Sequence, residues 1–379
     1  MEGYTPCRGR TGPGEGTALN DFHYAVVVGI NTYPAFPGRN LQFARDDADN
    51  FEAWLISPNG GALPPKNVQK ITASPAREAA FTGAADAYPT RTDVDQALLE
   101  VTNSARNDVS ADKRAWESTR LYVYVSGHGI APQGGEAALL LPNANEDMLG
   151  QNIELSLYSH WYEACGYFRE VVVFADCCRE QLGGTPTAIA PPFNVCFKPY
   201  GKTVPLLGYA TALGGTAYEP RRVPNPNEGR GYFTRALLAG LNGDAPDSLA
   251  SGAVTSRSLG PYLRDLVTKM TEKETVPQDV QVKTETTRVI VFRPAPQGAA
   301  PPARPKRKTV IAFPGGYSGV VELQTGTFAP VGTWDAAKGD WTVDLEEGLY
   351  IMKSQVAGAA AFANKGLFQV IGHNNRVQL

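Results

Sequence analysis

Two apolar runs, each followed at once by residues that carry chemistry, constrain this chain more than any other feature. Residues 121–125 (LYVYV) lead to the sequence SGHG at residues 126–129, and residues 171–174 (VVVF) lead to DCCR at residues 176–179. Continuous apolar runs of this length are typical of fully buried parallel strands. Because catalytic groups in open α/β sheets gather at the carboxyl ends of such strands, we expect an imidazole and a thiol to meet at one sheet edge.

Strand-like and helix-like patterns alternate along residues 22–293, which predicts an α/β domain with a predominantly parallel sheet flanked by helices. The expected strands are residues 24–30, 68–71, 121–125, 138–141, 171–174 and 204–210. The expected helices are residues 41–56, 93–109, 154–165, 233–241 and 258–270.

The composition changes on both sides of this domain. Residues 1–21 are rich in Gly, Thr and charge and have no apolar segment, so we expect a flexible leader and no secretory signal. Residues 294–308 (PAPQGAAPPARPKRK) are typical of a semi-rigid linker. Beyond them, short β-type runs separated by turn residues predict a small all-β accessory domain over residues 309–379.

The bulk composition excludes several classes of function. The formal net charge is −3, so there is no overall basic field to attract nucleic acid. No apolar run approaches the roughly 18 residues that span a bilayer, so no membrane partner is expected. The five cysteines include no Cys-x-x-Cys pair, and their odd number without a signal peptide predicts a reducing, cytoplasmic location.

His128 and Cys178 are the candidate catalytic pair. A thiol becomes a useful nucleophile when a neighbouring histidine takes its proton or stabilises the thiolate. Acyl transfer also needs backbone N–H donors for the oxyanion, and we assign the N–H groups of Gly129 and Cys178 to this role. The glycines beside His128 lack a Cβ, so the backbone can approach a substrate carbonyl. The pattern predicts a cysteine–histidine hydrolase.

At these residues the chain resembles the caspase-like cysteine peptidases, in the metacaspase-like form found in bacteria. The caspase signature is Gln-Ala-Cys-[Arg/Gln/Gly]-Gly, with its histidine about 50 residues upstream. Residues 176–180 (DCCRE) align with it and place the nucleophile at Cys178, and Asp-x-Cys is the metacaspase and bacterial form. Further stretches resemble the family in the same order, namely residues 28–33, 41–48, 208–212, 217–219 and 231–238.

The resemblance implies a caspase-like fold and a peptidase that cuts after basic residues. Metacaspase-like members carry acids in the S1 pocket, and the matching positions here are Asp47 and Asp176, with Asp46 beside them in a supporting role. Paired carboxylates bind a guanidinium through bidentate, charge-assisted hydrogen bonds, so Arg is expected at P1 and Lys less readily. No cofactor is expected, and calcium activation, which is common among metacaspases, is left open.

Several of these residues also have a purely structural interpretation. Asp46 and Asp47 lie at the start of an expected helix, where acids favour the helix dipole. Cys177 points to the opposite side from Cys178 in an extended backbone and is expected in the core. Glu180 stands where Gly or Ser is common, which leaves the shape of that loop open. Residues expected in structural or surface positions are Cys165, His23, His160 and His373.

The expected partners are protein substrates with exposed Arg or Lys, and an upstream activating protease or sensor. Arg221 and Arg222, in a turn-rich loop, and residues 304–308, in the linker, are candidate sites of self-cleavage in a zymogen. By resemblance, such proteases serve in regulated bacterial proteolysis, cell death or antiviral defence. Two other functions stay open: a non-catalytic adaptor with a caspase fold, and a regulator whose C-terminal β domain binds partners.

Overall fold

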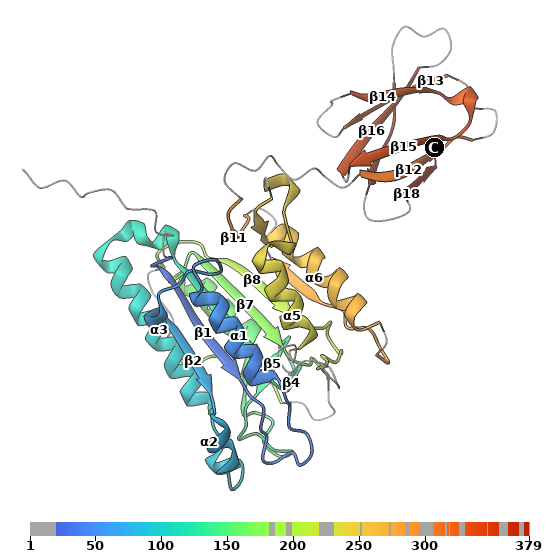
Figure 1. Cartoon of the computed structure of the whole chain (residues 1–379). Coiled ribbons are helices and arrows are strands. Elements are labelled where there is room, and N and C mark those ends of the chain that lie inside the picture. The colour runs from blue at the N-terminus through green and yellow to red at the C-terminus, as the bar shows by residue number, and fades with distance from the viewer. Residues whose placement is uncertain are drawn as a thin grey trace, which may run out of the picture. The chain divides into compact units, whose positions relative to one another are not determined.

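The computed structural model (Figure 1) describes residues 20–181, 186–194, 199–219, 231–250, 252–272, 274–284, 288–295, 306–314, 317, 319–325, 330–346, 348–355, 363–370 and 375–378. The chain divides into two compact units, Met1–Gln297 and Gly298–Leu379. Most of the expected leader and linker lies outside the described residues. The last three residues of the expected linker begin strand β12 (Lys306–Ala312) instead.

A six-stranded sheet forms the centre of the first unit, with the strand order β10-β8-β7-β3-β1-β2. All adjacent pairs are parallel except β10, which is antiparallel to β8. The strands are β1 (His23–Gly29), β2 (Val68–Thr72), β3 (Arg120–Ser126), β7 (Glu170–Asp176), β8 (Val204–Tyr209) and β10 (Gln281–Thr284). Strand β3 is buried throughout and β7 at all but its first residue, so the two apolar runs are indeed buried parallel neighbours.

Helices cover both faces of this sheet, as the alternating pattern predicts (Figure 1). They are α1 (Ala44–Ile56), α3 (Arg91–Ala111), α4 (Leu155–Cys165), α5 (Tyr232–Ala239) and α6 (Ser256–Met270). The short helix α2 (Pro75–Ala79) has no buried residue. Successive strand residues face opposite sides, so Val26 joins the core under α3 and α4 whereas Val27 joins the core under α1, α5 and α6. In the described part of the chain, no helix combines the length and the apolar character needed to cross a bilayer.

Shorter elements shape the loops around the sheet. Strands β4 (Gly129–Ile130), β5 (Ala138–Leu140) and β6 (Asn152–Glu154) form a separate three-stranded sheet, so the strand expected at residues 138–141 lies outside the central one. Strands β9 (Val254–Thr255) and β11 (Val291–Arg293) form an antiparallel pair. The short helical segments are η1 (Pro65–Asn67), η2 (Ala84–Asp86), η3 (Lys113–Ser118), η5 (Gly240–Asp244), η6 (Ser248–Ala250) and η7 (Ala336–Lys338).

The second unit is built from two small sheets, in agreement with the predicted β domain. One sheet has the order β15-β12-β18 and the other β14-β13-β16-β17. Ile311 and Trp341 from the first sheet share an apolar core with Val321 and Leu323 from the second. The remaining strands are β13 (Val320–Thr325), β14 (Pro330–Asp335), β15 (Trp341–Glu346), β16 (Gly348–Gln355), β17 (Ala363–Val370) and β18 (Asn375–Gln378).

Candidate active site

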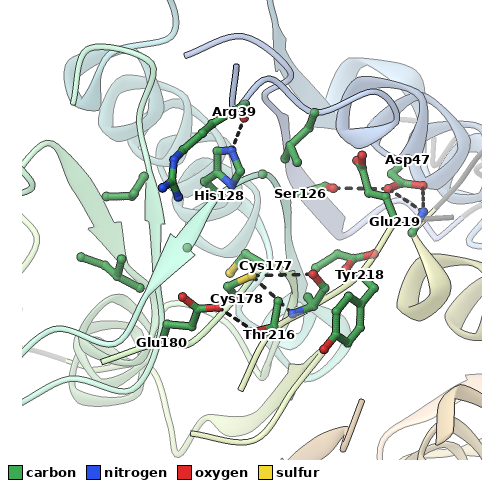
Figure 2. Close-up of a pocket in the computed structure, with 18 of the residues that line it drawn as sticks. Arg39, Asp47, Ser126, His128, Cys177, Cys178, Glu180, Thr216, Tyr218 and Glu219 are labelled. Atoms are coloured by element: carbon green, nitrogen blue, oxygen red, sulfur yellow. Dashed lines mark hydrogen bonds between the residues drawn. The ribbon is translucent and has the colours of Figure 1, made fainter. Parts of the chain in front are cut away.

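The register of the central strands brings the predicted residues to one edge of the sheet. Ser126 at the end of β3 lies level with Asp176 at the end of β7 and with Gly29 at the end of β1. His128 and Cys178 each follow two residues later, from these neighbouring strands. A cavity of about 330 Å³ opens at this edge, and both residues line it. Figure 2 shows His128 across this cavity from Cys178.

His128 is held both by its backbone and by its ring. Its N–H donates to the Tyr33 hydroxyl at 2.8 Å, and the centroids of the two rings are 4.6 Å apart. Ring atom Nε2 contacts the carbonyl oxygen of Arg39. Because a carbonyl oxygen only accepts, Nε2 carries the hydrogen and Nδ1 is left as the basic nitrogen. Burial lowers the pKa of His128, although the bond to the Arg39 carbonyl opposes this, so the ring is neutral at pH 7.

Tyr33→Phe is expected to lower both stability and turnover, because the Tyr33 hydroxyl bridges two backbone groups. It accepts from the His128 N–H and donates to the Leu140 carbonyl at 3.2 Å, and Tyr33 is only 1% exposed. Loss of the hydroxyl leaves both groups buried and unpaired, which costs about 1–3 kcal/mol. The freed backbone of His128 should lower kcat by about 10-fold. Urea unfolding and steady-state kinetics measure the two effects.

Tyr162→Phe is the matched control for this substitution. Tyr162 is equally buried, and its hydroxyl bonds to that of Thr102 at 3.1 Å, on α3 and away from the cavity. This variant should lose stability and keep its kcat. If Tyr33→Phe lowers kcat no more than Tyr162→Phe does, Tyr33 does not hold His128 in place.

The Cys178 side chain lies against Ala217 in this structure. Its Sγ accepts a hydrogen bond from the Ala217 N–H at 3.3 Å and lies 3.7 Å from the Ala217 carbonyl oxygen. Burial raises the pKa of Cys178 to about 11, although the N–H groups of Ala217 and Cys178 partly offset the rise. Among the described residues no hydrogen bond joins this thiol to His128. The resting pair is therefore a neutral thiol and a neutral imidazole.

Cys177 belongs to the core, as its alternation with Cys178 predicts. It is 2% exposed and packs in the apolar cluster, although it is also one of the residues that line the cavity, and burial raises its pKa well above that of an ordinary thiol. Gly129 packs closely against both cysteines: a Cβ at Gly129 would lie 2.7 Å from the Cys177 Sγ and 2.4 Å from the Cys178 carbonyl oxygen. The absence of a side chain at Gly129 therefore lets the His128 and Cys178 loops approach each other.

The pairing of β4 with β5 determines where the Gly129 N–H points. The Leu140 N–H donates to the His128 carbonyl at 2.8 Å, and Gly129 is level with Leu139. Since bonded and non-bonded pairs alternate along an antiparallel ladder, Gly129 falls in a non-bonded pair and its N–H turns away from β5. Gly129 lines the cavity, so this orientation is compatible with the predicted donation to an oxyanion.

Asp47 and Asp176 lie together at one end of the cavity, both almost fully buried. The Gly231 N–H donates to both oxygens of Asp47 at 3.1 Å, and the Ser126 hydroxyl donates to its Oδ2 at 3.3 Å. Oδ2 of Asp176 accepts from the N–H of Thr234 at 3.1 Å and from its hydroxyl at 2.7 Å. Both carboxylates therefore also meet the amino end of α5, a structural role that acids commonly take.

These hydrogen bonds do not offset the burial of negative charge. Burial raises the pKa of Asp47 well above its ordinary value, and the nearby charge of Asp176 raises it further. Burial likewise raises the pKa of Asp176 to about 6, although the Thr234 bonds oppose the rise. Without a bound cation, the pair thus holds protons more tightly than exposed carboxylates do. A cation placed between them would release those protons.

The sequence interpretation missed a third acid at this end of the cavity. The Glu219 carboxylate accepts from the N–H groups of Gln42 and Phe43, at 3.1 and 3.2 Å, and burial raises its pKa. It lines the same cavity as Asp47, and Figure 2 shows the two side by side. The one signal for Glu219 in the sequence was its position in residues 217–219, a stretch that resembles the family. Asp46 is not among the lining residues; its side chain is 46% exposed and lies 4.0 Å from Arg45.

Glycine is required at Gly231, where the backbone meets both carboxylates. A Cβ there would lie 2.3 Å from Oδ2 of Asp176 and 3.2 Å from Oδ2 of Asp47.

The loop that carries the nucleophile, whose shape the sequence left open at Glu180, is held by hydrogen bonds of Glu180 to two other segments. The Glu180 carboxylate accepts from the Thr216 hydroxyl at 2.6 Å, and its carbonyl accepts from the Ala131 N–H at 3.0 Å.

The remaining sequence candidates fall outside this site. Cys165 is in the core, His23 is partly buried at the start of β1, and His160 is exposed. Among the described residues, no group of three or more His, Cys, Asp and Glu side chains is arranged to hold a metal ion. Residues of interest outside the described ranges are Cys7, Cys196, Arg221, Arg222 and His373.

No protein-family model matches the chain. A curated relative, a probable protease from a Desulfuromonadales bacterium, is 32% identical over 228 residues, which are 58% of this chain and 26% of that protein. The chain thus spans about a quarter of the length of this relative. Among solved structures, caspase-1 from Spodoptera frugiperda aligns with a TM-score of 0.46 and 13% identity over 76% of this chain and 98% of that one. Pro-Sf-caspase-1 aligns with a TM-score of 0.42 and 13% identity, over 75% and 100%. The curated relative agrees with the peptidase class that the motifs predict.

Proposed function

We propose that this protein is a cysteine endopeptidase that hydrolyses protein substrates after Arg, and less readily after Lys, through His128 and Cys178. One observation supports this above the others. A single cavity holds a half-buried thiol, a neutral imidazole with a free basic nitrogen, and at one end two buried carboxylates and one half-buried carboxylate. The thiol and the imidazole are suited to acyl transfer, and the carboxylates are suited to binding a cationic side chain.

The proposed reaction begins with proton transfer within the neutral pair. Nδ1 of His128 takes the Cys178 proton as the sulfur attacks the scissile carbonyl carbon, and the N–H groups of Gly129 and Cys178 stabilise the oxyanion. Collapse of this intermediate breaks the C–N bond, and His128 returns the proton to the leaving amine. Water then attacks the thioester with His128 as base, which releases the acid product and restores the thiol.

The charge distribution favours Arg at P1. Among the described residues that line the cavity, the basic ones are His128 and Arg39, and Figure 2 shows Arg39 on the far side of His128 from Asp47 and Glu219. Within this described lining, no cation therefore lies beside the acidic end. A planar guanidinium can bond to two carboxylates at once, whereas an ammonium offers a single point charge. Arg is accordingly preferred to Lys.

The KM of a P1-Arg peptide is expected to rise as the pH falls through about 6, the raised pKa of Asp176. Below it the carboxylate is protonated and loses its attraction for the guanidinium, which stays charged throughout. Above about pH 7, where Asp176 is ionised, this contribution should level off. A P1-citrulline peptide has the shape of Arg without its charge, and its KM should show no such rise. The same rise for both peptides would contradict the carboxylate origin.

A peptide panel tests the proposal directly. Fluorogenic substrates with P1 Arg, Lys, citrulline or Asp are incubated with purified protein, with and without calcium, beside Cys178→Ala. Preferred turnover of Arg that Cys178→Ala lacks is the expected result. Preferred turnover of Asp would contradict the pocket assignment. No turnover in any condition would leave either an inactive zymogen or a non-catalytic adaptor.

We place this activity, as an extension of the proposal, in regulated bacterial proteolysis such as cell-death or antiviral signalling in the cytoplasm. The proposed activator is an upstream protease or sensor. Self-cleavage at Arg221, Arg222 or residues 304–308 would produce fragments in the wild type that Cys178→Ala lacks after the same incubation. Mass spectrometry of the two proteins measures this, and two identical intact chains would exclude self-cleavage.

A further inference from the structure

Arg179, the residue directly after the candidate nucleophile, is almost completely buried. It is 1% exposed, and it is the largest fully buried side chain among the described residues. Cys177, Cys178 and Glu180 line the cavity, whereas Arg179 does not. The Arg179 side chain is buried away from the cavity, so the guanidinium lies behind the wall that carries the thiol. A buried arginine needs partners for its charge and its donors.

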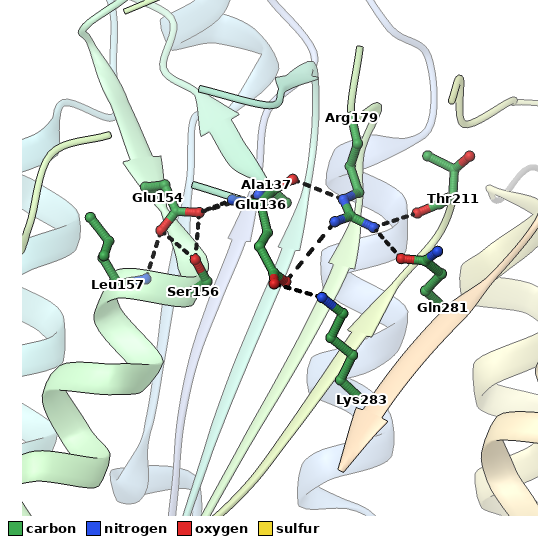
Figure 3. Close-up of polar contacts among 9 residues, drawn as sticks. All are labelled: Glu136, Ala137, Glu154, Ser156, Leu157, Arg179, Thr211, Gln281 and Lys283. Carbon is green, nitrogen blue, oxygen red and sulfur yellow. Dashed lines mark hydrogen bonds and ion pairs between the residues drawn. The ribbon is translucent and has the colours of Figure 1, made fainter. Parts of the chain in front are cut away.

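Three segments distant in sequence supply those partners (Figure 3). Nε donates to the Glu136 carbonyl at 2.9 Å, and Nη1 donates to the Thr211 carbonyl at 3.0 Å and to Oε1 of Gln281 at 2.9 Å. The guanidinium carbon lies 4.1 Å from the centre of the Tyr209 ring. The contacts join the loop before β5, the end of β8 and the edge strand β10. They use the fixed, planar set of donors that only arginine has.

The Glu136 end of this arrangement is itself tightly held. Glu154, which is 0% exposed, accepts from the N–H of Glu136 at 2.7 Å and from that of Ala137 at 3.2 Å. The Glu136 carboxylate lies 4.0 Å from the Arg179 guanidinium and bonds at 2.6 Å to Lys283 of β10. The contacts of Arg179 are therefore made with a rigid frame.

The backbone of Arg179 connects this frame to the thiol. Its N–H donates to the Gly215 carbonyl at 2.9 Å, and its carbonyl accepts from the Gly214 N–H at 2.8 Å. Two residues beyond Gly215 is Ala217, which contacts the Cys178 sulfur on both its N–H and its carbonyl. A shift of Arg179 would therefore move both Cys178 and the segment against which the sulfur lies.

We propose that Arg179 is a positioning residue that places the Cys178 thiol, and that Gln281 of edge strand β10 contributes through it. The inference about turnover rests on the proposed peptidase function, whereas the inference about the thiol does not. Misplacement of a nucleophile by about 1 Å is enough to cost up to about 10²-fold in rate. Among the described residues, no hydrogen bond joins the carboxylates at the acidic end of the cavity to the Arg179 side chain or its partners. Binding of a P1 side chain should therefore be unaffected.

Arg179→Lys and Gln281→Ala test this, with three readouts. Both variants should lower kcat by about 10-fold or more while KM changes little, because the acyl-transfer step is affected and the P1 pocket is not. At matched pH, the rate at which iodoacetamide alkylates Cys178 should differ between variant and wild type by about 5-fold or more, since that rate depends on the thiol's surroundings. Binding of agmatine, which carries the Arg guanidinium, should stay as in the wild type.

Arg120→Lys is the matched control. Arg120 is also buried, at 6% exposure, and its guanidinium bonds to Glu170, Tyr122 and Val291 at the opposite end of β3 from the cavity. It should lose thermal stability with kcat and alkylation unchanged. Gln281→Ala removes one neutral acceptor, so it decides the matter if Arg179→Lys does not fold.

The outcomes separate this inference from the proposed function. If Gln281→Ala and a folded Arg179→Lys retain the wild-type alkylation rate, Arg179 does not position the thiol. If alkylation changes while the wild type cleaves no peptide and binds no agmatine, the positioning role stands and the peptidase proposal fails. Loss of agmatine binding in parallel with kcat would show general damage to the site and would overturn the inference.

Discussion

Cys178→Ala is expected to reduce kcat/KM for a P1-Arg peptide by about 10⁶-fold, the typical effect of removing a nucleophile from a covalent peptidase. The thiol forms the acyl bond, and the other thiol in the described lining of the cavity, Cys177, is only 2% exposed. The Cys178 side chain is only half-buried, and the hydrogen bonds of its sulfur to another residue in the described part of the chain are those with Ala217, so its removal should cost little stability. Turnover is measured with enzyme amounts large enough to detect such a loss, beside a thermal melt.

Cys177→Ala is the control that the chain itself offers. It removes a thiol from the adjacent residue, but Cys177 is 2% exposed and lies in the apolar core. Loss of one buried sulfur should cost about 1 kcal/mol or somewhat more and leave kcat/KM within a few-fold of the wild type. Residual activity in Cys178→Ala, or an equal loss in Cys177→Ala, would show that the nucleophile has been wrongly assigned.

The sequence was sufficient to locate the candidate site because strand geometry carries that information. A fully apolar run has to be buried on both faces, and the residue after it has to emerge at the sheet edge. The equal spacing of His128 and Cys178 from the ends of β3 and β7 therefore brings them to one place once the strands pair in register. The apolar runs and the spacing of the two residues from their ends are local features, so one sequence without homologues is enough to recognise them.

The contacts that the sequence did not predict are of two kinds. Glu219 lines the same cavity as Asp47 although 172 positions separate them in the sequence, and no local pattern encodes such a long-range neighbour. The Arg39 contact to His128 uses a backbone carbonyl, which any residue type supplies. Arg179 would ordinarily be taken as exposed, and only the tertiary partners reveal why it is buried.

Other differences reflect the limits of periodicity. Asp46 and Asp47 are adjacent in α1, so their side chains point about 100° apart and only one of them can face the cavity. The family resemblance gave the pocket role to Asp47 and a supporting role to Asp46. In the structure Asp47 is buried and lines the cavity, whereas Asp46 does not line it. Strand β10 has the sequence QVKT, which contains no apolar run. It lies at the edge of the sheet and pairs only with β8 within it. An edge strand of this composition gives no strand signal, yet it supplies Gln281 and Lys283.

Asp176→Asn is expected to have opposite effects on function and on stability. For a P1-Arg peptide, kcat/KM should fall by about 10²- to 10³-fold, because one partner of a buried ion pair is lost and the guanidinium is left partly unpaired. For a P1-citrulline peptide the loss should be small. Asparagine retains an oxygen that can accept from Thr234, which holds Asp176 through its N–H and its hydroxyl, so α5 should stay in place.

The stability of the unliganded protein should change in the other direction. The pKa of Asp176 rises on folding from an ordinary 3.8 to about 6, so the native state binds the proton more tightly than the unfolded state does. The wild type therefore loses stability as the pH rises from about 4 to about 6, and the loss persists above that. Two pKa units correspond to roughly 2–3 kcal/mol. Asp176→Asn lacks this loss, so it should be more stable than the wild type at pH 8 and have no such advantage at pH 4.

Asp247→Asn provides the contrast in sign. The pKa of Asp247 is lowered: burial opposes this, but the hydrogen bonds from Thr255 and Leu249 and the charge of Arg257 outweigh it. Its replacement should therefore reduce stability at pH 8. Urea unfolding at pH 4 and pH 8, with and without agmatine, measures the stability of the wild type and of both variants. Agmatine should stabilise the wild type far more than Asp176→Asn. If Asp176→Asn is less stable than the wild type at pH 8 and still binds agmatine normally, the carboxylate is a helix cap and not part of a cation pocket.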